Sequence, residues 1–179
     1  AGLQAIATAR RLGAVVSATD VRPATKEQVE SLGATFVAVQ DEEFEQAQTG
    51  GGYAKEMSST YKEKQAALIA ETLAKQDIVI CTALIPGRPA PELISAEMVA
   101  SMKQGSVIVD LEVESGGNCA LSQIDKVVLK NGVQLLQQAD AVPQAIRTAA
   151  HSATTVREFL GALGDEMLGT HNGRIYYAD

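Results

Sequence analysis

The stretch AGLQAIATARRLGAVVSATD, residues 1–20, decides the fold class of this 179-residue chain. Apolar residues at helical spacing and a closing glycine predict a helix over residues 2–13. The segment at residues 14–20 is short and rich in residues that favour β-strands, which predicts a strand that ends in an acid. Asp20 therefore lies 18 residues after Gly2, which stands at the helix start. This spacing fits the third glycine and the acid of the G-x-G-x-x-G dinucleotide-binding fingerprint.

The rest of the chain continues the alternation of helices and strands. Further helices are expected at residues 26–32, 61–76, 94–102 and 145–163, and strands at 35–39, 77–84, 106–113 and 173–178. Asn131-Gly132 is typical of a two-residue hairpin turn. The alternation predicts an α/β fold with a Rossmann-like, doubly wound and mostly parallel sheet. We expect its first strand to lie upstream of residue 1 and to be missing here, and residues 1–179 to form one domain.

Composition excludes several classes of function. The chain is 46% hydrophobic with a formal net charge of −7, which indicates a globular acidic protein and argues against nonspecific binding to nucleic acid. It has no apolar run long enough to span a membrane. The two cysteines, Cys81 and Cys119, form neither a C-x-x-C pair nor a metal-binding spacing, so we expect no metal site and a reducing compartment. Cys81 lies in an apolar run and is expected to be buried.

Three loops are candidates for ligand binding. Residues 40–60 form a long polar segment with three glycines, and Tyr53 at its tip could cover a ligand, although composition alone favours an ordinary surface loop. TALIPGRPAP (82–91) and DLEVESGGN (110–118) follow apolar strands. Ligands of open α/β sheets bind beyond the carboxyl ends of strands, so these loops and Asp20 form one candidate site. Plain strand-to-helix connections remain the alternative for each loop.

The chemistry of Asp20 favours one nucleotide over another. Its carboxylate would accept hydrogen bonds from adenosine ribose hydroxyls and repel a 2′-phosphate, which favours NAD over NADP. Arg22 complicates this prediction, because an arginine nearby can pair with that phosphate. A glycine at a helix start and a polar strand end are the structural alternative. His151 and His171 stand in no recognisable triad motif, so no catalytic residue is assigned.

Several long strings resemble a known family. Residues 1–37, the loop GGGYAKEM, TALIPGRPAP and GSVIVDLEVESGGNC closely resemble the NAD(H)-binding domain I of the proton-translocating transhydrogenase alpha subunit. The wider family includes alanine dehydrogenase, and the GGYAKEM loop favours transhydrogenase. The resemblance is dense from residue 1 to about 121 and weak beyond it. We expect the family's upstream subdomain, with its Arg, Gln and Asp group near the nicotinamide, to lie outside these residues.

This resemblance implies a set of cofactor contacts. It assigns the third glycine of the phosphate turn to Gly2, and the ribose-binding acid and its neighbours to Asp20, Val21 and Arg22. Gly52 and Tyr53 would lie on the mobile loop that folds over the nucleotide. Gln65, Ala83 and Leu84 would contact NAD, with Leu84 towards the nicotinamide side. The resemblance further implies hydride transfer between NAD(H) and NADP(H), coupled to proton translocation. NADP(H) would be held by a partner domain, and protons would pass through a membrane domain.

The resemblance also implies an assembly and leaves two alternatives. It implies a homodimer at the cytoplasmic face of the inner membrane or on the mitochondrial matrix side, peripheral or part of a membrane complex. The first alternative is an NAD-dependent alanine dehydrogenase or a related amino-acid dehydrogenase. The second is a noncatalytic nucleotide-binding module, for which the missing segments of the chain are the argument.

Overall fold

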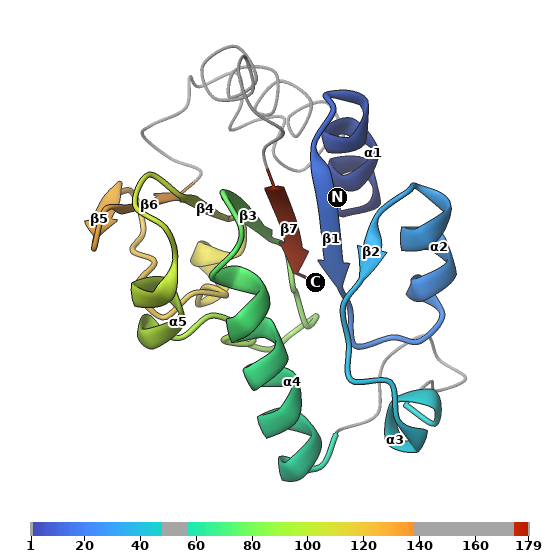
Figure 1. The fold of residues 1–179 in the computed structure, drawn as a ribbon. Coiled ribbons are helices and arrows are strands. Elements are labelled where there is room, and N and C mark those ends of the chain that lie inside the picture. Colours follow the sequence, from blue (N-terminus) through green and yellow to red (C-terminus); the bar gives the residue numbers. More distant parts are fainter. Residues whose placement is uncertain (1, 48–56, 138–173, 179) are drawn as a thin grey trace.

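The computed structural model describes residues 2–47, 57–137 and 174–178 (Figure 1). The first half of the chain forms α1 (Gly2–Arg11), β1 (Val15–Thr19), α2 (Thr25–Ser31), β2 (Thr35–Phe36), α3 (Glu42–Glu45) and α4 (Ser59–Leu73). The second half forms β3 (Ile78–Cys81), α5 (Ala96–Ser101), β4 (Val107–Asp110), the 3₁₀ turn η1 (Val113–Ser115), β5 (Val128–Lys130), β6 (Val133–Gln137) and β7 (Arg174–Ala178).

The strands form one sheet in the order β2-β1-β7-β3-β4-β6-β5. Every neighbouring pair is parallel except β5 and β6. This confirms the predicted Rossmann-like, mostly parallel sheet. The chain first winds outward through β1 and β2, then returns to β3 on the other side of β7 and winds the opposite way. The point where the winding reverses, which is where doubly wound sheets bind ligands, therefore lies at β7.

The centre of the sheet differs from the prediction. We expected the first strand to be missing, but β7 fills the place between β1 and β3 and runs parallel to both (Figure 1). Tyr176 is in register with Ser17 on one side and with Val79 on the other. The sheet is thus continuous. A strand from late in the sequence occupies the central place that a doubly wound fold usually gives to its first strand, the one that leads into the first helix.

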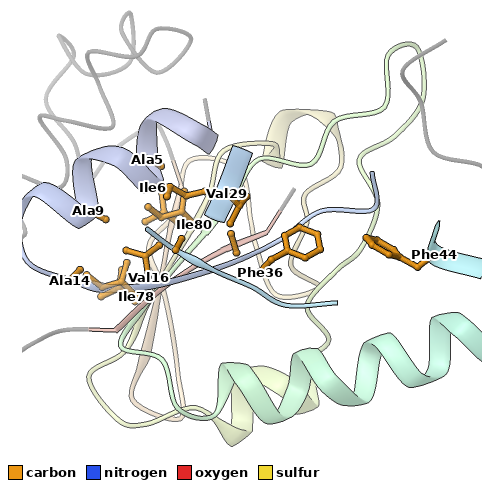
Figure 2. Packing of buried hydrophobic residues seen from close by; sticks show 14 of the residues in the cluster. Ala5, Ile6, Ala9, Ala14, Val16, Val29, Phe36, Phe44, Ile78 and Ile80 are labelled. Carbon is orange, nitrogen blue, oxygen red and sulfur yellow. The ribbon is translucent and has the colours of Figure 1, made fainter. Parts of the chain in front are cut away.

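Both faces of the sheet are covered by apolar side chains. Alternate residues of β3 point to opposite faces, so Ile78 and Ile80 join one core cluster while Val79 and Cys81 join the other. The first cluster includes residues of α1 and α2 packed on β1 and β3, and Figure 2 shows Ile6 among them. The second cluster includes residues of α4 and α5. All four residues of β3 and of β4 are buried, as strands covered on two faces must be.

The strand predicted at residues 35–39 ends earlier, because side chains form the hydrogen bonds of its last backbone groups. Val37 still donates a hydrogen bond to the carbonyl of Ala18, at 2.8 Å. At Val39, however, the N–H donates to Gln65 Oε1 at 2.8 Å and the carbonyl accepts from the Tyr61 hydroxyl at 3.1 Å. Both partners lie on α4, so this helix holds the chain after β2 in place of a neighbouring strand.

Part of the predicted loop at residues 40–60 is helical. Asp41 accepts a hydrogen bond from the N–H of Phe44 and caps the short helix α3, whose Phe44 ring is buried. Serine caps likewise set the start of α4 at Ser58 and of α5 at Ser95. The strand predicted at residues 106–113 ends at Asp110 and gives way to η1.

The hairpin prediction is confirmed. Asn131 and Gly132 have positive φ values of 51° and 78° and join the antiparallel strands β5 and β6, as a type I′ turn requires. The strand predicted at residues 173–178 is β7. The helix predicted at residues 145–163 lies outside the described residues. The single-domain prediction for residues 1–179 remains a prediction.

Candidate functional site

The candidate site lies at the carboxyl edge of the parallel strands. Asp20 directly follows β1, Thr82 directly follows β3, and Asp110 ends β4. Since β7 separates β1 from β3, and strands lie about 4.8 Å apart, the segments after β1 and β3 begin roughly 10 Å apart at the same edge. A ligand bound across the end of β7 would reach both segments.

The Asp20 carboxylate is buried and already oriented. It is 6% exposed and forms an ion pair with Arg22, whose Nη2 lies 2.6 Å from Asp20 Oδ2. Asp20 Oδ1 also accepts hydrogen bonds from the backbone N–H of Arg22 at 2.7 Å and from Arg22 Nε at 2.9 Å. This bidentate contact between a carboxylate and a planar guanidinium is strong and directional. The arginine side chain itself is 41% exposed, so it lies between the carboxylate and solvent.

Gln65 connects α4 both to the Asp20 segment and to the chain after β2, and Tyr61 contacts the chain after β2. Gln65 Nε2 donates to Thr19 Oγ1 at 3.1 Å, next to Asp20, while Gln65 Oε1 accepts from Val39. Burial raises the pKa of Tyr61 to about 12, and the negative charges of Asp41 and Glu43 add to the rise. The Tyr61 hydroxyl is therefore a neutral donor to the Val39 carbonyl at physiological pH.

A second buried amide organises the segment after β3. Asn118 is completely buried, and its side chain pairs with Ala83 in both directions. Asn118 Oδ1 accepts from the Ala83 N–H and Asn118 Nδ2 donates to the Ala83 carbonyl, each at 3.0 Å. The Nδ2 group also donates to the carbonyl of Pro91 at 2.8 Å. Ala83 is buried by this arrangement, whereas the next residue, Leu84, is 53% exposed.

The structure groups most of the predicted cofactor residues at this edge. Asp20, Val21 and Arg22 follow β1, and Gln65 reaches the same segment through Thr19. Ala83 and Leu84 follow β3. Gly2 is the buried first residue of α1. Gly52, Tyr53, His151 and His171 lie outside the described residues.

Sequence reasoning missed Asp110 and Asn118 as individual residues. Both lie in the segment DLEVESGGN that we singled out as a loop. A polar residue directly after two glycines beyond a buried strand was the available signal, because glycines let the chain turn back and bring a side chain against the neighbouring loop.

The two cysteines lie in the core. Cys81 and Cys119 are buried free thiols, which confirms the expectation for Cys81. Burial raises the pKa of the Cys81 thiol well above its ordinary value, and the nearby charges of Asp110 and Cys119 raise it further. In the stretches of the chain that the structure describes, no cluster of His, Cys, Asp and Glu could hold a metal, and no helix has the length and apolar character to cross a membrane.

A doubly wound sheet with an acidic residue after the strand that follows α1 defines a Rossmann-type α/β domain. Comparison with known proteins identifies the family more closely. Residues 1–171 match the family described as "Alanine dehydrogenase/PNT, C-terminal domain". The chain belongs to this family.

Several individual relatives are named transhydrogenases. The chain is 59% identical over 150 residues to an NAD(P) transhydrogenase alpha subunit of Rhodospirillum rubrum, and the match covers 84% of this chain and 39% of that relative. The crystal structure of transhydrogenase from Sinorhizobium meliloti superposes with a TM-score of 0.67 at 51% identity, over 93% of this chain and 42% of that one. Alanine dehydrogenase of Bacillus subtilis is 53% identical over 49 residues, 27% of this chain and 13% of the relative. Similarity to transhydrogenase is therefore the more extensive.

Proposed function

We propose that this chain is the NAD(H)-binding portion of a proton-translocating NAD(P) transhydrogenase. The single observation that carries the proposal is the buried, pre-oriented carboxylate of Asp20 at the carboxyl end of β1. A carboxylate in this position accepts hydrogen bonds from ribose hydroxyls in dinucleotide-binding folds. The names of the transhydrogenase relatives supply the reaction.

The arrangement of the edge suits a dinucleotide lying across β7. The adenosine ribose would lie at Asp20, Val21 and Arg22, with Gln65 bracing this segment from α4. The pyrophosphate would approach the start of α1 at Gly2, where the first-turn N–H groups have no partner within the helix and favour an anion. The missing side chain of Gly2 permits that close approach.

The nicotinamide would lie toward the segment after β3. The buried Ala83 would lie directly behind this contact, and Leu84 presents an exposed apolar side chain suited to one face of the ring. Gly52 and Tyr53 would belong to the loop that covers the nucleotide. The bound NAD(H) supplies the hydride chemistry, so this chain needs to orient the nucleotide and exclude water, and it needs no general acid or base.

The assembly follows from the same proposal. NADP(H) would be held by a partner domain that meets the exposed Leu84 side of the edge, and proton translocation would occur in a separate membrane domain. The chain would act as a homodimer at the cytoplasmic face of the inner membrane, or on the mitochondrial matrix side. The chain spans 39% of the length of its Rhodospirillum rubrum relative, and we propose that the complete activity requires these further domains.

Titration of the full-length protein with NADH, followed by nicotinamide fluorescence, tests this proposal. We expect saturable binding that Asp20→Asn weakens by about 1–3 kcal/mol, because a hydrogen bond to a buried charge is lost. Asp77→Asn is the matched control, since Asp77 precedes β3 at the opposite edge of the sheet. Absence of NADH binding by the unsubstituted protein, or equal effects of the two substitutions, would contradict the proposal.

Alanine dehydrogenase is the second candidate, and the shared family supports it. The two reactions differ in their hydride acceptor. The full-length protein, assayed with its NADP(H)-binding partner, is expected to transfer hydride from NADH to an NADP⁺ analogue. Oxidation of NADH by pyruvate and ammonia would instead favour the dehydrogenase, and NADH binding without either reaction would favour a noncatalytic nucleotide-binding module.

A further inference from the structure

Among the described residues, no strand pairs with the segment that follows β3. The last ladder contact between β3 and β4 is the hydrogen bond from the Leu111 N–H to the Cys81 carbonyl, at 3.0 Å. Beyond Asp110 the chain leaves the strand, and Val113–Ser115 form η1. A buried backbone group without a partner is costly, so the N–H and carbonyl of Ala83 must be satisfied by something other than a strand.

The Asn118 side chain supplies both missing partners. Its amide offers one acceptor and donors in a single plane, so it mimics the peptide unit of a neighbouring strand at Ala83. An aspartate could not donate and a leucine could do neither. The backbone of Asn118 is equally engaged, because its carbonyl accepts from the N–H groups of Leu93 and Ile94 at 2.8 and 3.0 Å.

Asp110 in turn fixes the position of Asn118. Its carboxylate is 1% exposed and accepts hydrogen bonds from the backbone N–H groups of Glu112, Asn118 and Cys119, at 3.1, 2.8 and 3.0 Å. These three contacts wrap the loop after β4 around one buried anion. The two loops are also joined directly, by a 2.7 Å hydrogen bond from the Ala90 N–H to the Ser115 carbonyl.

We propose that Asn118, held by Asp110, is a positioning residue that fixes the Ala83–Leu84 backbone against the nicotinamide half of the bound dinucleotide. This inference rests on the proposed NAD(H)-binding function. Asn118 is itself completely buried, so it acts through Ala83 and not by touching the nucleotide. The adenosine half is held beyond β7 by a separate set of contacts around Asp20 and Gln65. Loss of the Asn118 amide must therefore affect the two halves of the ligand unequally.

The test compares two ligands on the full-length protein: NADH, which spans both halves, and AMP, which occupies the adenosine half alone. We expect Asn118→Ala to weaken NADH binding by at least about tenfold and to change AMP binding by less than about twofold. The fluorescence emission of bound NADH is expected to shift, because the nicotinamide surroundings change. Gln76→Ala is the control: it removes another buried amide, which donates to the Thr72 carbonyl at 2.9 Å, at the opposite end of β3.

A second variant and a measurement on the unsubstituted protein test the inference even if Asn118→Ala does not fold. Asn118→Asp keeps the size of the side chain and the acceptor for the Ala83 N–H, and we expect the same unequal loss. In the unsubstituted protein, amide hydrogen exchange at Leu84 is expected to slow with NADH and not with AMP. Equal weakening of NADH and AMP, unchanged NADH affinity in both variants, or equal protection of Leu84 by both ligands would overturn the inference. No NADH binding by the unsubstituted protein would instead refute the proposed function.

Discussion

At the scale of single residues, Gly117 shows how closely the buried anion of Asp110 is enclosed. Its φ of +82° lies in the left-handed region, and a Cβ built there would lie 3.2 Å from Asp110 Oδ2. We expect Gly117→Ala to lower the free energy of unfolding by about 1–2 kcal/mol for the backbone strain alone, with a further loss from crowding the carboxylate. Gly13→Ala is the control, because Gly13 has φ +88° and open space around it. Urea unfolding measures both, and equal losses would argue against crowding at Asp110.

Arg22 makes a prediction about nucleotide choice. The Asp20 carboxylate pairs with the Arg22 guanidinium, and we expect it to repel a 2′-phosphate. Asp20→Asn should weaken that grip and leave a cation beside the ribose site, so the preference for NADH over NADPH is expected to fall by about tenfold or more. In Asp20→Asn combined with Arg22→Ala, the gain in NADPH affinity should disappear. Fluorescence titrations with both nucleotides measure this, and a gain that survives in the double variant would show that Arg22 is not responsible.

At the scale of elements, Gln65 and Tyr61 of α4 hold Val39 after β2, and we call these contacts the Val39 clamp. The clamp predicts that the stability of the fold depends on pH. The pKa of Tyr61 is raised to about 12 in the folded protein, above its ordinary value of 10.0. A raised pKa means that the folded state favours the protonated phenol. The contribution of the Tyr61 phenol to folding stability is therefore fully present below about pH 10 and is lost as the pH rises toward about 12.

Tyr61→Phe tests that clamp. It should cost about 1 kcal/mol near neutral pH, because the hydrogen bond to Val39 is lost. The variant should also lose stability less steeply above about pH 10 than the unsubstituted protein. Urea unfolding of both proteins at neutral and alkaline pH measures the difference. Parallel pH profiles would mean that the Tyr61 phenol titrates normally in the folded state.

Sequence patterns predicted the elements well where the signal is local. Helix periodicity, the apolar runs of β3 and β4 and the Asn131-Gly132 turn placed their elements within a few residues of the observed bounds. Patterns failed where a distant side chain decides the outcome. The end of β2 depends on Gln65, which is 26 residues beyond Val39, and the shape of the loop after β3 depends on Asn118, which is 35 residues beyond Ala83. Asp20 could be singled out as a candidate because its spacing from Gly2 fits a known fingerprint, and its role stays a prediction.

At the scale of the whole molecule, the position of β7 is the feature that no local pattern indicates. Residues 173–178 were predictable as a strand, but pairing with both β1 and β3 depends on contacts with strands far earlier in the chain. A central strand joins the two oppositely wound halves of the sheet, so it also sets the separation between the Asp20 and Ala83 segments. The candidate site therefore depends on β7 even though its proposed contacts lie on neighbouring strands.

Proline substitution tests this central position. Every backbone N–H of β7 faces a neighbouring strand, so Tyr176→Pro removes a ladder hydrogen bond whichever way that group points. We expect a loss of at least about 2 kcal/mol in the free energy of unfolding, since a buried carbonyl is left without a partner. Leu129→Pro is the matched control, because β5 pairs on one side only and Leu129 is 68% exposed, so a smaller loss is expected there.

If urea unfolding showed that Tyr176→Pro is tolerated as well as the edge substitution, β7 would not lie between β1 and β3. NADH affinity should fall in Tyr176→Pro and not in Leu129→Pro, because only the central strand holds the two halves of the candidate site at their distance.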